Sequence, residues 1–269
     1  RVNPDVDPRT HPYIATGLRE SKFGVDVAEA RRLYALAAKD EALAVKGIAC
    51  HIGSQITTMR PFLDAVGRVL ALAEELRRQG IAIRHLDVGG GLGIRYKDED
   101  PPHPDAYGEA IRKALGKFDG EVLLEPGRVL VGNAGVLVTR VLYVKRSGRK
   151  VFVVVDAAMN DLVRPAFYDA HHELELAGPP RKGAREIVAD VVGPICESSD
   201  FLARKRRMQE PEPGDLLAVR SAGAYGFTMS SNYNSRPRAA EVMVDGNQAH
   251  LVRRREEVAQ LFEHEAVLP

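Results

Sequence analysis

The stretch IAIRHLDVGGGLG (residues 81–93) is a short apolar run that leads directly into a loop with four glycines among five residues. An amphipathic helix is predicted before it, over residues 62–79, because apolar side chains recur there at helical spacing between a proline and a glycine. A strand at residues 46–50 precedes that helix, while a helix at 105–118 and a strand at 122–125 follow the glycines. This alternation predicts parallel strands joined by crossover helices.

The same alternation extends to the start of the chain. Residues 1–3 have the character of a strand, and residues 27–39 combine apolar residues at helical spacing with strong helix formers. Four strands with three intervening helices are therefore expected. They indicate either an α/β barrel or a doubly wound sheet.

The composition changes after Arg128. Short Val-rich runs predict strands within residues 129–144 and at 150–155, 187–192, 215–219, 239–244 and 249–252, and a closing helix is expected over 255–264. The basic cluster at 204–207 is interpreted as a solvated loop, since acidic residues follow it closely. We therefore predict two domains, an α/β part over residues 1–128 and an antiparallel β domain over residues 129–269.

Composition excludes several classes of protein. The 38 Lys and Arg against 37 Asp and Glu give a net charge of +1, so no basic field indicates nucleic acid. The apolar runs, such as residues 151–155, are far shorter than the ~20 residues that a membrane helix needs. Two cysteines are too few for a disulfide scaffold, which favours the reducing cytoplasm.

Three of the predicted strands end in motifs suited to a ligand: HIGSQ (residues 51–55), GGGLG (89–93) and EPGR (125–128). In α/β barrels the active site lies at the carboxyl ends of the strands. The backbone of Gly89, Gly90 and Gly91, aided by Ser54 and Arg128, could hold a phosphate. A glycine run is also compatible with nothing more than a tight turn, and its spacing is not that of a dinucleotide-binding fingerprint.

Glu125 and His51 each admit a structural and a functional interpretation. A buried Glu125 could pair with Arg128, or it could hold the protonated pyridine nitrogen of pyridoxal phosphate. His51 could be an ordinary core histidine or a flat ring that stacks on a cofactor.

Three segments of the second half have polar residues typical of substrate recognition: residues 159–168, 193–200 and 221–226. They contain Arg164, Tyr168, the Cys196-Glu197 pair and Tyr225, which together could recognise a zwitterion. Taken by itself, a cysteine such as Cys196 is more often an inert buried thiol than a catalyst. The spacing of His, Cys and Asp suggests no metal site.

As a set, these motifs resemble the diaminopimelate decarboxylases, pyridoxal phosphate enzymes with the alanine-racemase-like fold. The resemblance extends over nearly the whole chain and includes NPDVD (residues 3–7), HPYI (11–14), KFG (22–24), HIGSQ, DVGGGLG (87–93), EPGR, CESSD (196–200) and GAYG (223–226). It implies that residues 1–128 are the second half of a TIM-like α/β barrel.

The resemblance also implies roles for individual residues. His51 would stack on the pyridine ring, Glu125 would pair with its nitrogen, and Cys196 would donate a proton. The phosphate would be held by Ser54, by Gly89, Gly90 and Gly91, and by the EPGR segment with Pro126, Gly127 and Arg128. Meso-diaminopimelate would be bound by Arg128, Arg164, Tyr168, Glu197 and Tyr225, and Tyr225 would also contact the cofactor. The family implies a homodimer whose Cys-Glu loop completes the partner's site.

One family element has no counterpart in the sequence, the lysine that attaches the cofactor within a Tyr-Ala-x-Lys-Ala motif. In YALAAK (residues 34–39) the lysine is two positions late and falls in a predicted helix. Together with the first residue, Arg1, and the four visible barrel strands, this predicts that an amino-terminal part is missing. The 269 residues alone are then expected to be inactive.

Several functions remain open on these grounds. The leading one is decarboxylation of meso-2,6-diaminopimelate to L-lysine and carbon dioxide, the last step of lysine biosynthesis. Arg164 with Glu197 suits its distal end, which has both a carboxylate and an ammonium group. A decarboxylase of ornithine, lysine or arginine is the alternative within the same class. A non-catalytic homologue is the alternative outside it.

Overall fold

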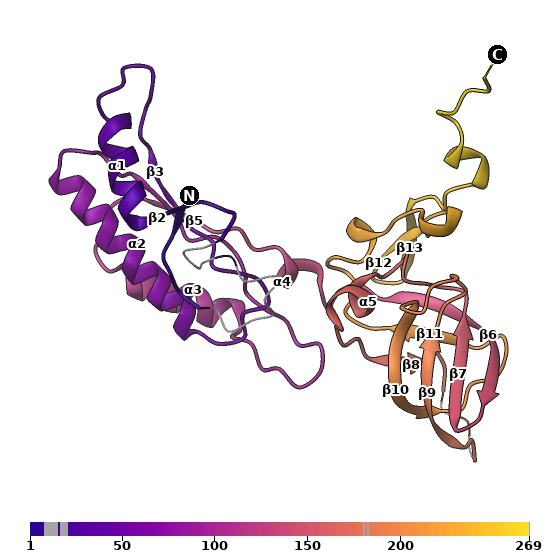
Figure 1. The fold of residues 1–269 in the computed structure, drawn as a ribbon. Helices are drawn as coiled ribbons and strands as arrows, with labels where there is room; N and C mark the ends of the chain where they lie inside the picture. Colours follow the sequence, from indigo (N-terminus) through magenta and orange to yellow (C-terminus); the bar gives the residue numbers. More distant parts are fainter. Residues whose placement is uncertain (8–15, 17–20, 180, 182, 269) are drawn as a thin grey trace. The chain divides into compact units, whose positions relative to one another are not determined.

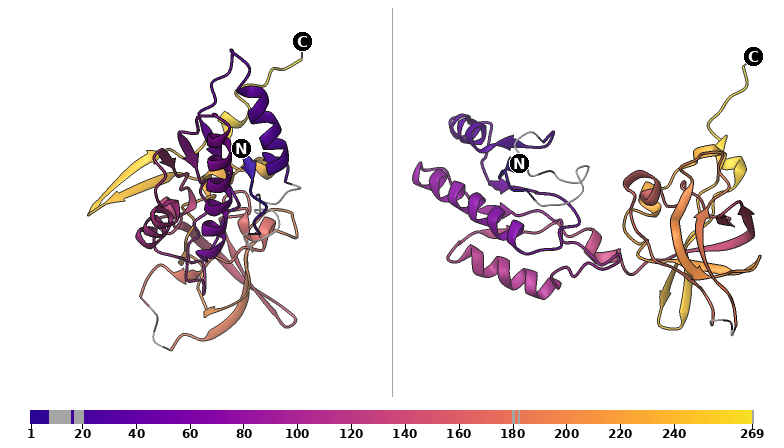
Figure 2. Two further views of the ribbon diagram at one scale, coloured as in Figure 1. Left: turned by 90° about the vertical axis from the view of Figure 1, so that its left-hand side faces the viewer. Right: turned by 60° about the horizontal axis from the view of Figure 1, so that its bottom comes forward.

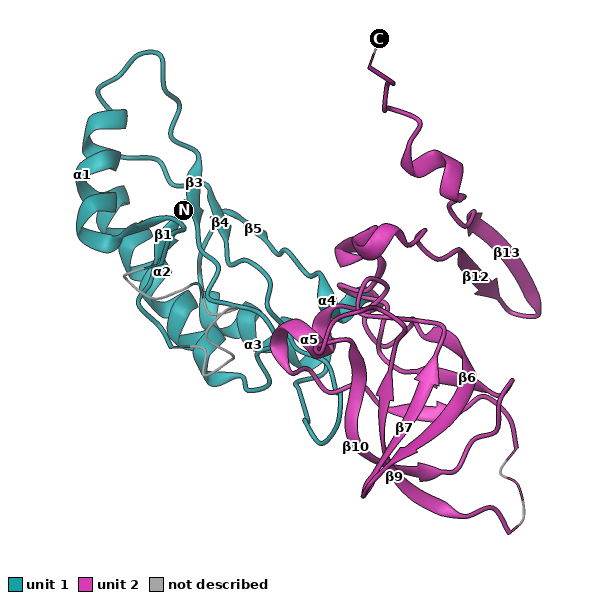
Figure 3. Cartoon of the chain, turned by 45° about the vertical axis from the view of Figure 1, so that its right-hand side comes forward, with its two compact units in different colours: residues 1–130 teal, residues 131–269 magenta. Residues whose placement is uncertain are grey.

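The structure, a computed structural model, describes residues 1–7, 16, 21–179, 181 and 183–268. The chain forms two compact units, Arg1–Leu130 and Val131–Pro269 (Figure 3). Each unit has its own hydrophobic core. The HPYI segment (residues 11–14) lies outside the described residues.

Unit 1 consists of short parallel strands and the helices that connect them (Figure 1). The strands are β1 (Val2–Asn3), β2 (Val25–Asp26), β3 (Gly47–Ala49), β4 (His85–Asp87) and β5 (Glu121–Leu123), and the helices are α1 (Val27–Ala37), α2 (Arg60–Arg78) and α3 (Pro104–Leu115). β1 pairs with β2, and β3, β4 and β5 form a parallel sheet in that order. The expected alternation of strand and helix is present, with β2 as an additional strand.

Helix α2 forms because its apolar side chains fall on one face. Pro61 stands in its first turn, where the missing N–H is not needed, and Phe62, Val69 and Leu76 are buried in the core. Helix α3 runs alongside α2 (Figures 1 and 2), and the rings of Phe62 and Tyr107 meet edge to face at 4.9 Å between centroids. Such a pair adds about 0.5–1.5 kcal/mol to the stability that area burial supplies.

The register of the three-stranded sheet determines where the site lies. Ile48, Leu86 and Val122 are aligned across β3, β4 and β5. Because the strands are parallel and in register, their carboxyl ends share one edge of the sheet. The loops that follow the three strands therefore lie next to one another.

Unit 2 is built around one six-stranded sheet in the order β10-β9-β7-β6-β11-β8. The strands are β6 (Leu137–Ser147), β7 (Lys150–Val155), β8 (Leu174–Leu176), β9 (Glu186–Val192), β10 (Phe201–Gln209) and β11 (Leu216–Val219). β8 and β10, at the two ends of this order, also contact each other, so the sheet is a nearly closed barrel. One pair, β7 with β9, is parallel, so the predicted antiparallel domain is mostly rather than entirely antiparallel.

A separate hairpin, β12 (Glu241–Asp245) with β13 (Gln248–Arg253), projects from the six-stranded sheet within unit 2 (Figure 3). Val242, Val244 and Leu251 are exposed on it. A two-stranded hairpin with exposed apolar side chains is marginally stable on its own in water.

Two expectations for the second half are wrong in detail, and the sequence did not suggest the short helices α4 (Arg128–Val131) and α5 (Arg164–Tyr168). The cluster at 204–207 is not a loop but part of β10, whose two register shifts and positive φ at Lys205 disrupt the alternation that would reveal a strand. The closing helix over 255–264 is only a 3-10 turn at Val258–Leu261, because that segment has no fully buried side chain to anchor a longer helix.

Candidate active site

The loops after β3, β4 and β5 are linked by backbone hydrogen bonds. Glu125 N–H donates to the carbonyl of Gly89 at 2.9 Å, and Ile56 N–H donates to that of Gly91 at 2.9 Å. A Cβ atom at Gly90 would lie 2.0 Å from the carbonyl oxygen of Glu125, and one at Gly89 would lie 2.4 Å from that of Cys50. The glycines therefore allow three backbones to approach closely, which is more than a tight turn requires.

His51 lies half-buried beside these glycines. Its Nδ1 accepts a hydrogen bond from Gly90 N–H at 3.2 Å, which leaves the ring proton on Nε2. Burial is the main cause that lowers the pKa of His51, and the nearby Arg1 lowers it further. A neutral, flat imidazole therefore lies beside Gly90 in the loop that follows β4.

The first two glycine N–H groups are used inside the protein. Gly89 N–H donates to the Asp87 carboxylate at 2.8 Å, and Gly90 N–H donates to His51. This differs from the expectation that both point at a phosphate. Neither of these two N–H groups is therefore available to an anion in this structure.

Arg128 is the main cation of this region, and it is only 6% exposed. Its guanidinium donates to Ser54 Oγ at 3.1 Å and to the hydroxyl of Tyr96 at 2.5 Å. The predicted association of Ser54 with Arg128 is therefore present. Tyr96 was not predicted, because it lies 32 residues from Arg128 in the chain and no motif marks it. A buried guanidinium beside a hydroxyl is a suitable site for a phosphate.

Glu125 is exposed, not buried as expected. It follows β5 at the end of the sheet, where the chain opens to solvent, and Pro126 and Gly127 are exposed as well. An exposed carboxylate does not need Arg128 to stay ionised, so the argument that a buried Glu125 requires a cation does not apply to this structure.

In unit 2, Arg164 begins the short helix α5 and Tyr168 ends it. Arg164 is 7% exposed, and its Nη1 lies 2.8 Å from Nε2 of His172, which is fully buried. His172 was not predicted, since a lone histidine between α5 and β8 has no recognisable pattern. Tyr168 is half-buried, with its ring 4.8 Å from that of Phe167.

The Cys196-Glu197 loop is exposed but firmly attached. One oxygen of Asp200 accepts the N–H of Met159 at 2.7 Å, and the other accepts the N–H of Ile195 at 2.8 Å. Burial raises the pKa of Asp200. Asp200 therefore connects the two predicted loops of unit 2, and only its place in the CESSD motif marked it in the sequence.

The two cysteines differ in their surroundings. Cys196 is exposed, so it is not the inert buried thiol that the sequence left open. Cys50 is buried at the end of β3, where desolvation raises its pKa to about 12. Only Cys196 is accessible for chemistry. Next to it, Glu197 accepts a hydrogen bond from the hydroxyl of Tyr233 at 3.3 Å.

Tyr225 lies on a constrained loop of unit 2, with a φ of 58° and 38% exposure. Ala222 N–H donates to the carbonyl of Gly135 at 2.8 Å, and Asn133 donates to Ser221 Oγ at 2.7 Å. The loop of Tyr225 is therefore attached to the segment that follows α4. Backbone strain of this kind is often found at functional positions.

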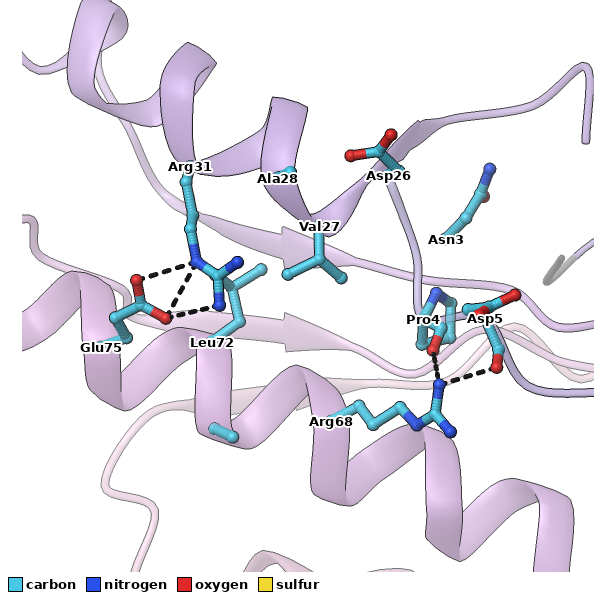
Figure 4. A pocket seen from close by; sticks show the side chains of 11 residues that line it. Asn3, Pro4, Asp5, Asp26, Val27, Ala28, Arg31, Arg68, Leu72 and Glu75 are labelled. Carbon is cyan, nitrogen blue, oxygen red and sulfur yellow. Dashed lines mark hydrogen bonds and ion pairs between the residues drawn. The ribbon is translucent and has the colours of Figure 1, made fainter. Parts of the chain in front are cut away.

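A cavity of about 500 Å³ lies between α1, α2 and the β1–β2 pair (Figure 4). Arg31 forms a bidentate pair with Glu75 across it, and Arg68 donates to the carbonyls of Pro4 and Asp5. None of the predicted site residues lines it. Its charges serve to join α1, α2 and the start of the chain.

Among the described residues, no three or more His, Cys, Asp or Glu side chains gather as metal ligands. None of the described helices combines the length and the apolar character that crossing a bilayer demands.

A comparison with known families gives a match that ends close to the boundary between the two units. Residues 1–132 match the family model of the pyridoxal-dependent decarboxylases, pyridoxal binding domain. Pyridoxal phosphate is therefore the cofactor of this domain, as predicted, and the predicted fold, part of an α/β barrel followed by a largely antiparallel β domain, is confirmed.

Individual relatives match the whole chain. The diaminopimelate decarboxylase of Pseudomonas aeruginosa is 57% identical over 269 residues, all of this chain and 64% of that protein. The crystal structure of diaminopimelate decarboxylase from Helicobacter pylori with L-lysine has a TM-score of 0.92 at 41% identity, over 97% of this chain and 65% of that one. A lysine/ornithine decarboxylase from Vibrio vulnificus with cadaverine has a TM-score of 0.74 at 26% identity, over 81% of this chain and 59% of that one.

The chain thus spans 64% of the length of these curated relatives. Residues 1–132 belong to the pyridoxal binding domain family of the pyridoxal-dependent decarboxylases, and the chain as a whole is similar to diaminopimelate decarboxylases.

Proposed function

We propose that the full-length protein containing this chain decarboxylates meso-2,6-diaminopimelate to L-lysine and carbon dioxide. The observation that supports this most is the 57% identity to a diaminopimelate decarboxylase over all 269 residues, which include both units. A lysine/ornithine decarboxylase shares the fold at only 26% identity, which makes decarboxylation of lysine or ornithine the second candidate.

Unit 1 has groups that fit pyridoxal phosphate. The buried guanidinium of Arg128 with Ser54 beside it would hold the phosphate, in a loop where Gly89, Gly90 and Gly91 let the backbone come close. His51, as a neutral flat ring, would stack on the pyridine, and Glu125 would face its nitrogen. When bound, this cofactor supplies an electron sink for the carbanion left by carbon dioxide.

Unit 2 has groups that fit the distal end of the substrate. Arg164 would bind the distal carboxylate, Glu197 would bind the distal ammonium, and Tyr168 and Tyr225 would complete the recognition together with Arg128 of unit 1. Cys196, whose thiol is exposed, would donate a proton to the carbon that loses carbon dioxide. Lysine and ornithine have no distal carboxylate and give Arg164 no partner.

The kinetics of carbon dioxide release test this proposal. The full-length wild type and its Arg164→Ala and Glu197→Ala variants are compared on meso-diaminopimelate, L-lysine and L-ornithine. We expect meso-diaminopimelate to be preferred, and Arg164→Ala to lower its kcat/KM by more than about tenfold, since one decade is ~1.4 kcal/mol. Arg146→Ala on β6, an exposed arginine that pairs with Glu210, is the matched control. A wild type that prefers ornithine or lysine contradicts the substrate assignment.

We also propose a cytoplasmic homodimer in which the Cys196-Glu197 loop of one protomer completes the site of the other. Mixing inactive Arg128→Ala and Cys196→Ala proteins tests this, because a mixed dimer would contain one site with both residues intact. Recovered activity supports shared sites. No recovery after subunit exchange contradicts them.

A further inference from the structure

His172 makes two side-chain hydrogen bonds that determine its protonation state. Its Nδ1 lies 2.8 Å from the carbonyl oxygen of Arg220, and its Nε2 lies 2.8 Å from Nη1 of Arg164. A carbonyl only accepts and a guanidinium only donates. His172 therefore has its proton on Nδ1, uses the Nε2 lone pair as the acceptor, and is neutral.

This contact orients Arg164 without cancelling its charge. A carboxylate in the place of the imidazole would form an ion pair and offset the positive charge of the guanidinium. The neutral ring fixes one guanidinium nitrogen instead and does not itself offset the positive charge. Because His172 is fully buried and Arg164 is 7% exposed, both side chains are held by packing.

The surroundings of His172 keep the ring in place. Arg206 of β10 donates to the backbone carbonyl of His172 at 2.8 Å and pairs with Glu173 at 3.0 Å. Arg220, whose carbonyl anchors Nδ1, forms an ion pair with Glu175 of β8. The two carboxylates are thus engaged by arginines, and the ring is fixed between α5, β8 and the end of β11.

We propose that His172 is a positioning residue that orients the Arg164 guanidinium toward the distal carboxylate of the substrate. This rests on the proposed function, since it assumes that Arg164 binds that carboxylate. His172 itself touches neither substrate nor cofactor. Its effect is transmitted through a single hydrogen bond from Arg164.

Two variants separate the two nitrogens of the ring. His172→Gln can place an amide oxygen near the position of Nε2 and so still accept from Arg164. His172→Asn can place an amide N–H near the position of Nδ1, and it loses the acceptor for Arg164. A merely structural role would make both variants defective in proportion to their loss of stability.

The measurements are made on the full-length holoenzyme with meso-diaminopimelate. We expect His172→Asn to raise KM by about tenfold or more with little change in kcat, and His172→Gln to restore KM to near the wild-type value. Affinity for L-lysine bound as the product, whose one carboxylate is the distal carboxylate of meso-diaminopimelate, should fall in His172→Asn, whereas affinity for cadaverine, which has no carboxylate, should not. His250→Asn is the control, because His250 is an exposed histidine of the β12–β13 hairpin.

A double-mutant cycle shows whether the effect passes through Arg164. In an Arg164→Ala background, His172→Asn should change KM no further. Additive effects overturn the proposal, as does a wild-type KM in His172→Asn. A wild type that does not act on meso-diaminopimelate overturns the proposed function instead.

The tautomer is tested in the wild type, independently of whether any variant folds. The ¹⁵N chemical shifts of selectively labelled histidine should show His172 protonated at Nδ1 and unprotonated at Nε2. A proton on Nε2 overturns the proposal, because that nitrogen could then not accept from Arg164.

Discussion

The two units hold their candidate residues by different means. In unit 1 three loops are joined by backbone hydrogen bonds, and glycines allow the chains to approach each other. In unit 2 the loops are joined by buried polar side chains, above all His172 and Asp200. Unit 1 should therefore be most sensitive to added atoms, and unit 2 to the loss of a single donor or acceptor.

The largest effect is expected from Gly90→Ala in unit 1. The new Cβ would lie 2.0 Å from the Glu125 carbonyl, so the loops after β4 and β5 must separate. We expect a loss of stability of about 1–3 kcal/mol and a failure to retain pyridoxal phosphate. Thermal unfolding and cofactor absorbance of the full-length protein measure both.

Gly67→Ala is the matched control, because Gly67 lies in α2 and a Cβ there meets nothing within 4 Å. It should stabilise the protein by up to about 1 kcal/mol through higher helix propensity. Equal stability and equal cofactor retention in the two variants would show that the glycines are not needed for the close approach of the backbones.

The next largest effect is expected from Asp200→Asn in unit 2. The amide cannot accept both backbone N–H groups, and its own N–H₂ would face one of them, at a cost of about 1–3 kcal/mol. The loop of Cys196 should shift, which lowers kcat more than it changes cofactor affinity.

Asp190→Asn provides the comparison for that variant, because Asp190 accepts a backbone N–H from Lys205 on the β9–β10 pair and contacts no predicted site residue. Its kcat should stay near that of the wild type. A kcat equally low in both variants would mean that the loop is not specifically held by Asp200.

The smallest effect is expected from Glu256→Gln, far from either group of site residues in the chain. Hydrogen bonds from the Arg238 side chain lower the pKa of Glu256 to about 2, with further bonds from Arg238 N–H and Asn232. Because the pKa in the folded state lies below the ordinary value of 4.5, this stabilisation is present above pH 4.5 and is lost as the pH falls toward 2.

Glu256 is partly exposed, so solvent screening limits its contribution to about 1 kcal/mol. Glu256→Gln should lower the unfolding free energy at pH 7 and match the wild type near pH 2, as measured by chemical denaturation. A difference that persists at pH 2 would contradict the ion-pair explanation.

The sequence predicts the loops of unit 1, which backbone hydrogen bonds join, better than it predicts the loops of unit 2, which side chains join. Strands followed by His51, the glycines and EPGR are local patterns, and parallel strands place their ends together. Tyr96 and His172 could not be found in this way, because each acquires its partner only when distant segments fold together. Glu125 was expected to be buried, yet it is exposed beyond the end of a three-residue strand.

In unit 2, a run of charged residues prevented the prediction of a strand. β10 has four consecutive basic residues and two register shifts, so its alternation is broken although Phe201, Leu202 and Met208 are buried. For the expected closing helix, the error has a different cause. The sequence of residues 255–264 favours a helix, but none of its side chains is fully buried in a core that would stabilise one.

The most direct test of the division between the two units compares Arg128→Ala with Arg164→Ala in the full-length protein. The dissociation constant of pyridoxal phosphate is measured together with KM for meso-diaminopimelate. The division predicts that Arg128→Ala weakens cofactor binding by about tenfold or more, through loss of a charge-assisted contact. Arg164→Ala should leave cofactor binding unchanged and raise KM. Equal losses of cofactor affinity in both variants would contradict the assignment of cofactor to unit 1 and substrate recognition to unit 2.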